Sequence, residues 1–221
     1  MSKPAAALCA DEQAATPATA SISGPVVSHQ AWQRPDLHLV LVNPQIPQNT
    51  GNAARTCAAT AVALHLVGPL GFELDSAKLK RAGLDYWEWV AVAVHTDWAA
   101  FERHFDSVAG PKRMVAFSKL GRRHHASEGL YRRGASNWAV FGAETTGLPP
   151  EACAAAERSG GAVAKIPMAN YEHVRSLNLA TSVGALLLCS WRGAPPRGDS
   201  RRVPACAWLM QALGSSRRCV N

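Results

Sequence analysis

Short apolar segments alternate with helical stretches through the middle of this 221-residue chain, and this alternation limits the folds open to it. The expected strands are β-branched and apolar at nearly every position, and they cover residues 37–42, 64–68, 89–94, 113–118, 138–142 and 162–166. Helices are expected at about residues 51–62, 76–82, 97–106, 150–158 and 178–191. Continuously apolar strands separated by helices are typical of parallel sheets. The sequence therefore predicts an α/β fold, a mostly parallel sheet with helices on both faces.

The two ends of the chain depart from this pattern. Residues 1–36 are rich in Ala, Ser, Thr and Pro without periodicity, which predicts a disordered N-terminal extension. Residues 37–193 are expected to form one domain, and residues 194–221 a basic, flexible tail. Transit peptides are rich in Arg and poor in acids, whereas the extension contains Asp11 and Glu12. We expect a cytoplasmic protein, with the chloroplast or mitochondrion as the alternative if the extension is a targeting peptide.

The composition restricts the partners of the chain. It contains 23 Lys and Arg against 16 Asp and Glu, and such a basic balance favours a polyanion such as nucleic acid. The six cysteines include no CxxC pair, and no histidine spacing is typical of a zinc site, which predicts a reducing compartment and no structural metal. No apolar run approaches the length that spans a bilayer, so no membrane partner is expected.

Four unusual loops each follow an expected strand. They are NPQIPQNTGN at 43–52, FSKLG at 117–121, GAETTGLP at 142–149 and IPMANYEHVRSLN at 166–178. Gly and Pro often do no more than end a strand, but these loops are also rich in amides and hydroxyls. Because ligands bind beyond the carboxyl ends of parallel strands, the loops predict a ligand site at that edge of the sheet.

Familiar nucleotide and hydrolase motifs are missing from these loops. No GxGxxG opens the first helix, no GxxxxGK[ST] is present, and neither a serine nucleophile elbow nor a pair of carboxylates stands out. The residues alone indicate an α/β enzyme or binding protein with a basic surface, and they do not specify a reaction.

Three segments taken together resemble a known superfamily. NTGNAART at 49–56, FGAETTGLP at 141–149 and IPM…RSLNLA at 166–180 resemble, in order and spacing, the three motifs of the SPOUT superfamily of RNA methyltransferases. The segment LKRAGLDYWEW at 79–89, together with IPQNTGN, is similar to the tRNA (cytidine/uridine-34) 2′-O-methyltransferase family, the TrmL-like enzymes. The resemblance covers about residues 37–193.

This resemblance implies a fold and an activity. The fold would carry a C-terminal deep trefoil knot that holds S-adenosylmethionine, in a homodimer whose protomers share the active site. The substrate would be the anticodon stem-loop of tRNA, methylated without a metal at the ribose 2′-hydroxyl of wobble nucleotide 34. The alternatives are another tRNA or rRNA site, or a non-catalytic knotted RNA-binding protein. The ribosomal RNA enzymes usually carry an additional N-terminal RNA-binding domain, and 36 residues are too few to form one.

The resemblance also implies catalytic residues, namely Asn49, Arg55, Glu144, Ser176 and Asn178. Asn49 and Arg55 would both face the target ribose, from the loop and the first helical turn. Arg55 matches the residue that activates the 2′-hydroxyl, but a guanidinium stays protonated in proteins. We therefore expect Arg55 to bind the flanking phosphate and to stabilise the developing alkoxide. Glu144, Ser176 and Asn178 would order the loops and orient the hydroxyl.

The cofactor residues follow from the same resemblance. Phe117, Gly142, Ile166 and Ser176 match the positions that line the methyl donor, mostly through backbone groups. A basic run, residues 112–133, surrounds the first of these positions. Most charge runs are solvated faces, but this run flanks an expected cofactor loop, which favours contact with RNA phosphates.

Overall fold

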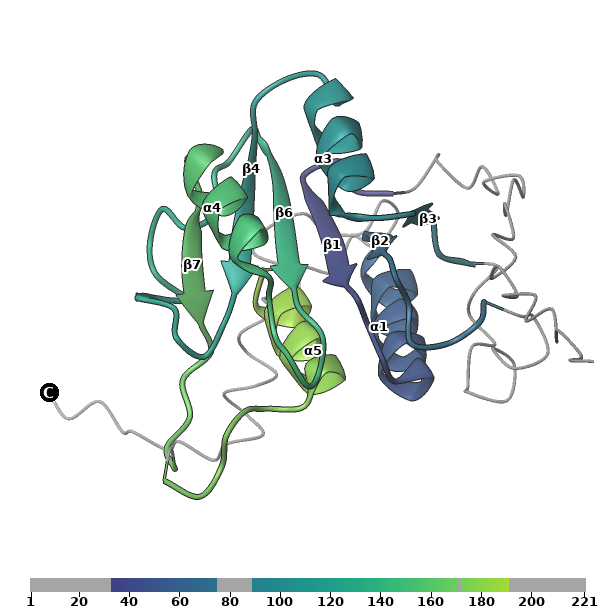
Figure 1. Ribbon diagram of the computed structural model, residues 1–221. Helices are drawn as coiled ribbons and strands as arrows, with labels where there is room; N and C mark the ends of the chain where they lie inside the picture. The colour runs from purple at the N-terminus through teal and green to yellow at the C-terminus, as the bar shows by residue number, and fades with distance from the viewer. Residues whose placement is uncertain (1–32, 75–88, 171, 191–221) are drawn as a thin grey trace, which may run out of the picture.

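The computed structural model describes residues 33–74, 89–170 and 172–190, which form one α/β fold (Figure 1). Its elements, in chain order, are β1 (Leu37–Val42), α1 (Pro47–Thr60), β2 (Ala63–Val67), β3 (Val92–His95), α3 (Trp98–Ser107), β4 (Lys112–Phe117), β5 (Arg123–His124), β6 (Ser136–Phe141), α4 (Pro150–Arg158), β7 (Ala162–Lys165) and α5 (Leu179–Ser190). The helix expected at 76–82 lies outside the described residues, as does most of the 79–89 segment.

The strands form one seven-stranded sheet in the order β3-β2-β1-β6-β4-β7-β5. Every pairing between these strands is parallel, and β1 lies between β2 and β6 with Leu39 opposite both Leu64 and Ala139. The prediction of a mostly parallel sheet is thus confirmed. Because parallel strands end at one edge, the loops after β1, β4, β6 and β7 meet there.

Helices cover both faces of this sheet (Figure 1), as the apolar strands predicted. On one face, Leu37, Leu39 and Leu41 of β1 pack with α1 and α5. On the other face, Val40 and Val42 pack with α3 and α4. Burial of apolar surface on both faces stabilises the fold at about 25 cal/mol per Å². Within the described residues, no helix is both long enough and apolar enough to span a membrane.

The structure differs most from the expected elements at three places. Helix α1 begins at Pro47, not at residue 51, because proline is favourable at the first helical position, where its missing N–H is not needed. Strand β3 begins at Val92, not at residue 89. Strand β5, Arg123–His124, was not predicted, since two polar residues carry no apolar pattern and pair only at the sheet edge with β7.

The residues just before β1 also contact the domain. The backbone N–H of Arg34 donates to the carbonyl of Ala61 at 2.9 Å, and the carbonyl of Asp36 accepts from the backbone N–H of Asn137 at 2.9 Å. The Arg34 guanidinium pairs with the Asp36 carboxylate at 2.7 Å and holds the pKa of that carboxyl below its usual value. Residues just before Leu37 are therefore part of the packed domain.

Candidate active site

A cavity of about 520 Å³ lies at the carboxyl edge of the sheet, where the expected loops meet. Its walls come from the loops after β4, β6 and β7 and from the first turn of α1. Seven of the expected site residues line it: Asn49, Phe117, Gly142, Glu144, Ile166, Ser176 and Asn178. Arg55 does not line it. The motifs are far apart in the chain, and the parallel sheet brings them together.

The wall formed by the loop after β6 requires a glycine at position 142. A Cβ atom built on Gly142 would lie 2.1 Å from the carbonyl carbon of Gly147, which no side chain can occupy. Ala143 and Gly147 pair across the loop as an antiparallel bridge, and Gly147 has a φ of +74°, in the left-handed region. The loop thus closes into a narrow turn at the cavity wall, next to the stacked rings of Phe117 and Phe141, 4.8 Å apart.

Three of the expected catalytic residues are joined in one chain of hydrogen bonds. The Asn49 side-chain amide donates to Glu144 Oε1 at 3.0 Å, and Asn49 Oδ1 accepts from the Asn178 amide at 3.0 Å. Asn49 is buried, with 7% of its surface exposed. Each end of this amide is therefore engaged, and Asn49 ties α1 to the loop after β6 and to the start of α5.

Glu144 also holds the backbone that leads into α1. Its Oε2 accepts from the backbone N–H of Gln45 at 2.9 Å, and its Oε1 accepts from that of Ile46 at 3.3 Å. Ile46 is the N-cap of α1 and has no oxygen in its own side chain to offer. A carboxylate is favourable at this positive end of the helix. Glu144 therefore supplies from a distant loop the negative charge that the start of α1 lacks.

Asn178 stands at the beginning of α5. Its Oδ1 accepts from the backbone N–H of Thr181 at 3.2 Å, which is the contact expected of an N-cap. The same side chain donates to Asn49, so it fixes the direction of α5 and joins the amide chain at once. Ser176, two residues earlier, is exposed at the cavity wall.

Arg55 is not where the sequence placed it. Since α1 begins at Pro47, Asn49 lies in the first turn of the helix and Arg55 in the third. Six residues of helix rotate a side chain by about 600°, which leaves the two side chains about 120° apart. Asn49 accordingly is buried beside Glu144, while Arg55 is exposed. The expected placement of Asn49 in a loop and of Arg55 in the first helical turn is therefore wrong, whereas the expectation that both residues face the target ribose stays a prediction.

The basic run divides into two groups. Arg113 and Arg123 donate to the carbonyls of Gly129 and Glu128 at 3.0 and 2.7 Å, so they hold the segment between β4 and β6 in place. Lys112 donates to the carbonyls of Asp106 and Val108 at the end of α3, each at 2.7 Å. Lys119 is exposed and lines the cavity. The exposed members of the run beyond it are Arg122, Arg132 and Arg133. Only this second group is placed to meet phosphates.

The sequence did not predict the backbone amides that donate to Glu144. The amides of Gln45 and Ile46 act through the main chain, so no residue type marks them. The one available signal was Pro47, whose place at the first helical position fixes where the preceding amides point.

A mostly parallel sheet with a cavity of glycine- and amide-rich loops at its carboxyl edge defines a class of α/β ligand-binding folds that includes RNA methyltransferases. Residues 36–188 match the SpoU rRNA Methylase family, and the chain belongs to this family. The resemblance read from the three motifs is thereby confirmed.

Individual relatives cover nearly the same part of the chain. The tRNA (cytidine(34)-2′-O)-methyltransferase of Saccharophagus degradans is 41% identical over 155 residues, which span 70% of this chain and 94% of the relative. A putative tRNA (cytidine(34)-2′-O)-methyltransferase of Synechocystis sp. is 46% identical over 149 residues, 67% of this chain and 91% of the relative.

Solved structures agree with these relatives. A structure from work on the 2-OH methylation of C/U34 on tRNA is similar with a TM-score of 0.59 and 44% identity, covering 71% of this chain and 94% of that one. An AdoMet-bound rRNA methyltransferase from Sinorhizobium meliloti is similar with a TM-score of 0.60 and 25% identity, covering 73% and 57%.

Proposed function

We infer that the chain is an S-adenosylmethionine-dependent methyltransferase that methylates the ribose 2′-hydroxyl of nucleotide 34, cytidine or uridine, of tRNA. The observation that carries this inference is the chain of hydrogen bonds from Glu144 through Asn49 to Asn178 at the rim of the cavity. These hydrogen bonds join the three sequence motifs. The protein is also 41–46% identical to enzymes named for this reaction, and the match covers at least nine-tenths of the length of each enzyme.

The cavity fits the cofactor. Its volume of about 520 Å³ lies within the range of about 300–1,000 Å³ found for small-molecule sites. Phe117 and Ile166 give it apolar walls, and the turn at Gly142 lets backbone groups approach a ligand closely. When bound, S-adenosylmethionine supplies an electrophilic methyl group. The residues of the chain then have to orient the ribose oxygen toward that group, and positioning alone can contribute about 7–11 kcal/mol.

Asn49, Glu144 and Asn178 serve this reaction as positioning residues. Glu144 already accepts from two backbone amides and one side chain, and Asn49 uses both ends of its amide. These contacts hold the loops after β1, β6 and β7 in one arrangement. Ser176, exposed at the cavity wall, is the group we assign to contact the ribose hydroxyl or the cofactor.

Arg55 is assigned to the cavity of a second protomer. It is exposed on α1 and lies outside the cavity of its own chain. In a homodimer, Arg55 would face the partner's cavity and place a permanent positive charge at the ribose. In the free protomer the same guanidinium would stay exposed to solvent. At the partner's cavity the guanidinium would hold the phosphate and stabilise the charge that develops on the oxygen.

We further propose that the chain forms the trefoil knot that its family resemblance implies. The chain runs from β4 through β5 to β6 before it reaches β7, yet β7 lies between β4 and β5 in the sheet. This order is the one that passage of β7 through the loop of residues 118–135 would produce. Gly121 of that loop lies so close to Ala164 of β7 that a Cβ would be 2.3 Å from its carbonyl carbon. Such threading is very rare.

The partner of the exposed basic group is the tRNA. Lys119 at the cavity wall and Arg122 next to it would bind phosphates of the anticodon stem-loop, whose unstacked nucleotides suit recognition of a single ribose. A cytoplasmic location, with an organelle as the alternative, stays a prediction from the composition of residues 1–36.

The test is incubation of the full chain with methyl-labelled S-adenosylmethionine and either total tRNA or rRNA, followed by mapping of the methylated nucleotide. We expect label in tRNA, at the 2′-oxygen of nucleotide 34. Label confined to rRNA, or to another tRNA position, would contradict the proposal. Cofactor binding without any transfer would favour the non-catalytic RNA-binding alternative.

A further inference from the structure

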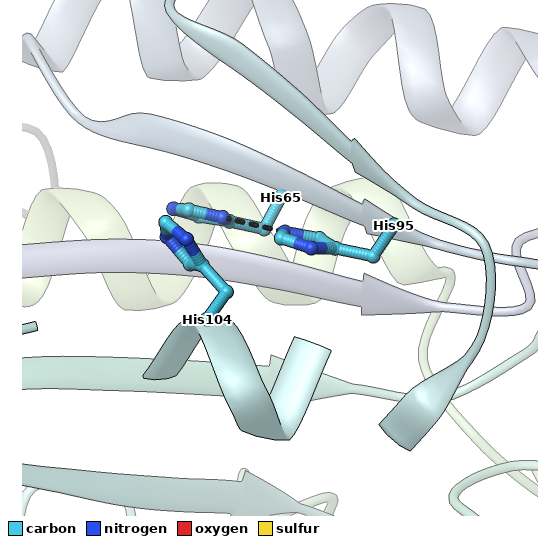
Figure 2. Close-up of side chains that lie close together, drawn as sticks. All are labelled: His65, His95 and His104. Carbon is cyan, nitrogen blue, oxygen red and sulfur yellow. Dashed lines mark hydrogen bonds between the residues drawn. The ribbon is translucent and has the colours of Figure 1, made fainter. Parts of the chain in front are cut away.

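A second cluster of polar side chains lies between the sheet and helix α3, away from the cavity. Figure 2 shows His65 of β2, His95 of β3 and His104 of α3 directed toward one another. His65 and His95 are buried, with 5% and 9% of their surface exposed, and His104 is partly exposed. The three residues come from three elements on the α3 face of the sheet, so only the tertiary fold brings them together.

The nitrogen atoms of the cluster are close enough to share a metal ion. One ring nitrogen of each histidine lies within 4.8 Å of those of the other two. His65 Nδ1 and His95 Nε2 are 3.1 Å apart. In a tetrahedral zinc site with Zn–N bonds of 2.0–2.1 Å, neighbouring nitrogens lie about 3.3–3.4 Å apart. The pair needs only a small change, and His104, near the end of a surface helix, is free to approach by rotating its side chain.

A fourth histidine stands behind the cluster as an outer partner. His38 Nδ1 lies 3.3 Å from His65 Nε2, and the His38 ring stacks on Trp138 with centroids 4.0 Å apart. Histidines that ligate metals usually donate their other N–H to an outer acceptor, commonly a carboxylate, a carbonyl or water, which fixes the tautomer. A neutral His38 could accept in that role through Nδ1. If His65 Nε2 donates to His38, the lone pair of His65 is on Nδ1, the atom that faces His95.

The imidazoles are held in the form that binds metals. Burial lowers the pKa of His95 to about 4, and burial also lowers the pKa of His65 and of His104. Neutral imidazole is the form that ligates a metal.

We propose that His65, His95 and His104 form a binding site for one first-row transition-metal ion of the Zn²⁺ type. Three imidazoles suit Zn²⁺, Ni²⁺ or Cu²⁺ and do not suit Mg²⁺ or Ca²⁺, which prefer oxygen. Three protein ligands would leave a fourth position for water. The ion joins β2, β3 and α3, and it takes no part in methyl transfer, because the cavity is lined by other elements. The inference does not depend on the proposed function.

The experiment is a titration of the chelator-treated full chain with Zn²⁺ and, separately, with Co²⁺. We expect one ion per protomer, a visible absorption of Co²⁺ typical of four-coordinate geometry, and a rise in Tm of about 5–10 °C at a Zn²⁺ concentration 100 times Kd. His38→Phe, which keeps the stacking on Trp138, should weaken Zn²⁺ binding by about 10–100-fold. His104→Ala should weaken it more, since a ligand is lost.

The control is His124→Ala. His124 is exposed on β5 beside His125, with ring centroids 4.7 Å apart, and it offers a competing surface pair. The proposal predicts unchanged Zn²⁺ affinity in this variant. It is overturned if the chain binds no Zn²⁺, if His104→Ala binds as tightly as the parent chain, or if His124→Ala removes the binding. Circular dichroism of the metal-free variants shows that each is folded.

Discussion

The carboxyl edge of the sheet and the histidine cluster both gather polar groups, but they do so by different means. At the edge, Glu144, Asn49 and Asn178 come from loops and helix starts, and much of their bonding is to backbone amides. In the cluster, His65 and His95 come from within strands and bond to each other, side chain to side chain. Loops can carry polar side chains without disturbing the core. A polar side chain on a central strand is buried, so it needs a hydrogen-bond partner inside the core.

The largest expected effect falls on the edge. Arg55→Ala should reduce kcat for methyl transfer by about 10²–10³-fold, the range for loss of one group that stabilises transition-state charge. Binding of S-adenosylmethionine, measured by calorimetry, should not change, since Arg55 does not line the cavity. Arg103→Ala, an exposed arginine of α3, is the matched control and should keep full activity. Near-normal kcat with weaker tRNA binding would make Arg55 a phosphate anchor only.

A mixed dimer sharpens the assignment of Arg55 to the partner's cavity. Ile166→Trp should fill the cavity and abolish cofactor binding. If Arg55→Ala and Ile166→Trp protomers are exchanged at random, half of the dimers are mixed and each has one intact site. About one quarter of the parent activity should return. No recovery, in dimers shown to exchange, would place Arg55 at the cavity of its own chain.

The cluster should dominate the response of the metal-free protein to acid. Burial lowers the pKa of His38 and of His95 from 6.5 to about 4. Between these pH values the unfolded state binds more protons than the folded state, so stability is full above pH 6.5 and is lost as the pH falls toward 4. The shift in the His38 pKa corresponds to roughly 3 kcal/mol, and the shift in the His95 pKa acts in the same direction. Urea unfolding at pH 7 and pH 4.5 measures the loss, which His38→Phe should reduce. Equal losses in both proteins would contradict the assignment.

A smaller effect is expected when a negative charge is introduced at the carboxyl edge, next to Glu144. Asn49→Asp removes the donor to Glu144 and sets two carboxylates against each other. We expect a loss of about 1–3 kcal/mol in the free energy of unfolding, the cost of unmaking a buried hydrogen bond. Thermal unfolding measures it, and Asn52→Asp, at an exposed position of the same helix, is the control. Unchanged stability of Asn49→Asp would show that the amide chain does not hold the loops together.

The smallest effect tests the basic group. Arg122→Ala should raise KM for tRNA by a few fold and leave kcat unchanged, because one phosphate contact weakens binding and does not alter the chemistry. Arg123→Ala should differ, since Arg123 donates to the carbonyl of Glu128 and supports the loop itself. Steady-state kinetics at two salt concentrations distinguish them. A kcat effect in Arg122→Ala would place that residue at the reaction.

The same comparison explains what the sequence could predict. The residues at the carboxyl edge belong to short motifs that follow expected strands. Because the alternation of strands and helices predicts a parallel sheet, it also predicts that these motifs lie at one edge. The cluster has no such signature. His65 and His95 are 30 residues apart in the chain, and His104 follows His95 by 9 residues. His65 and His95 meet because β2 and β3 pair with Val67 opposite His95. The expectation of no structural metal came from spacing along the chain, which does not report register.

Helix α1 shows where residue patterns fail even within a motif. Three polar residues before the alanines read as loop, whereas Pro47 starts the helix there. That shift of four residues adds about one turn before Arg55, which lies in the third turn and does not line the cavity. The spacing of two residues in the sequence predicts the directions of their side chains only when the first residue of the helix is known.

The most direct measurement uses tRNA that differs by one oxygen. Two transcripts of the same tRNA are prepared, one with ribose and one with 2′-deoxyribose at nucleotide 34 alone, and each is incubated with the chain and methyl-labelled S-adenosylmethionine. The account predicts one methyl group on the ribose transcript and none on the deoxy transcript, with similar affinity for both. Equal labelling of the two transcripts would contradict it.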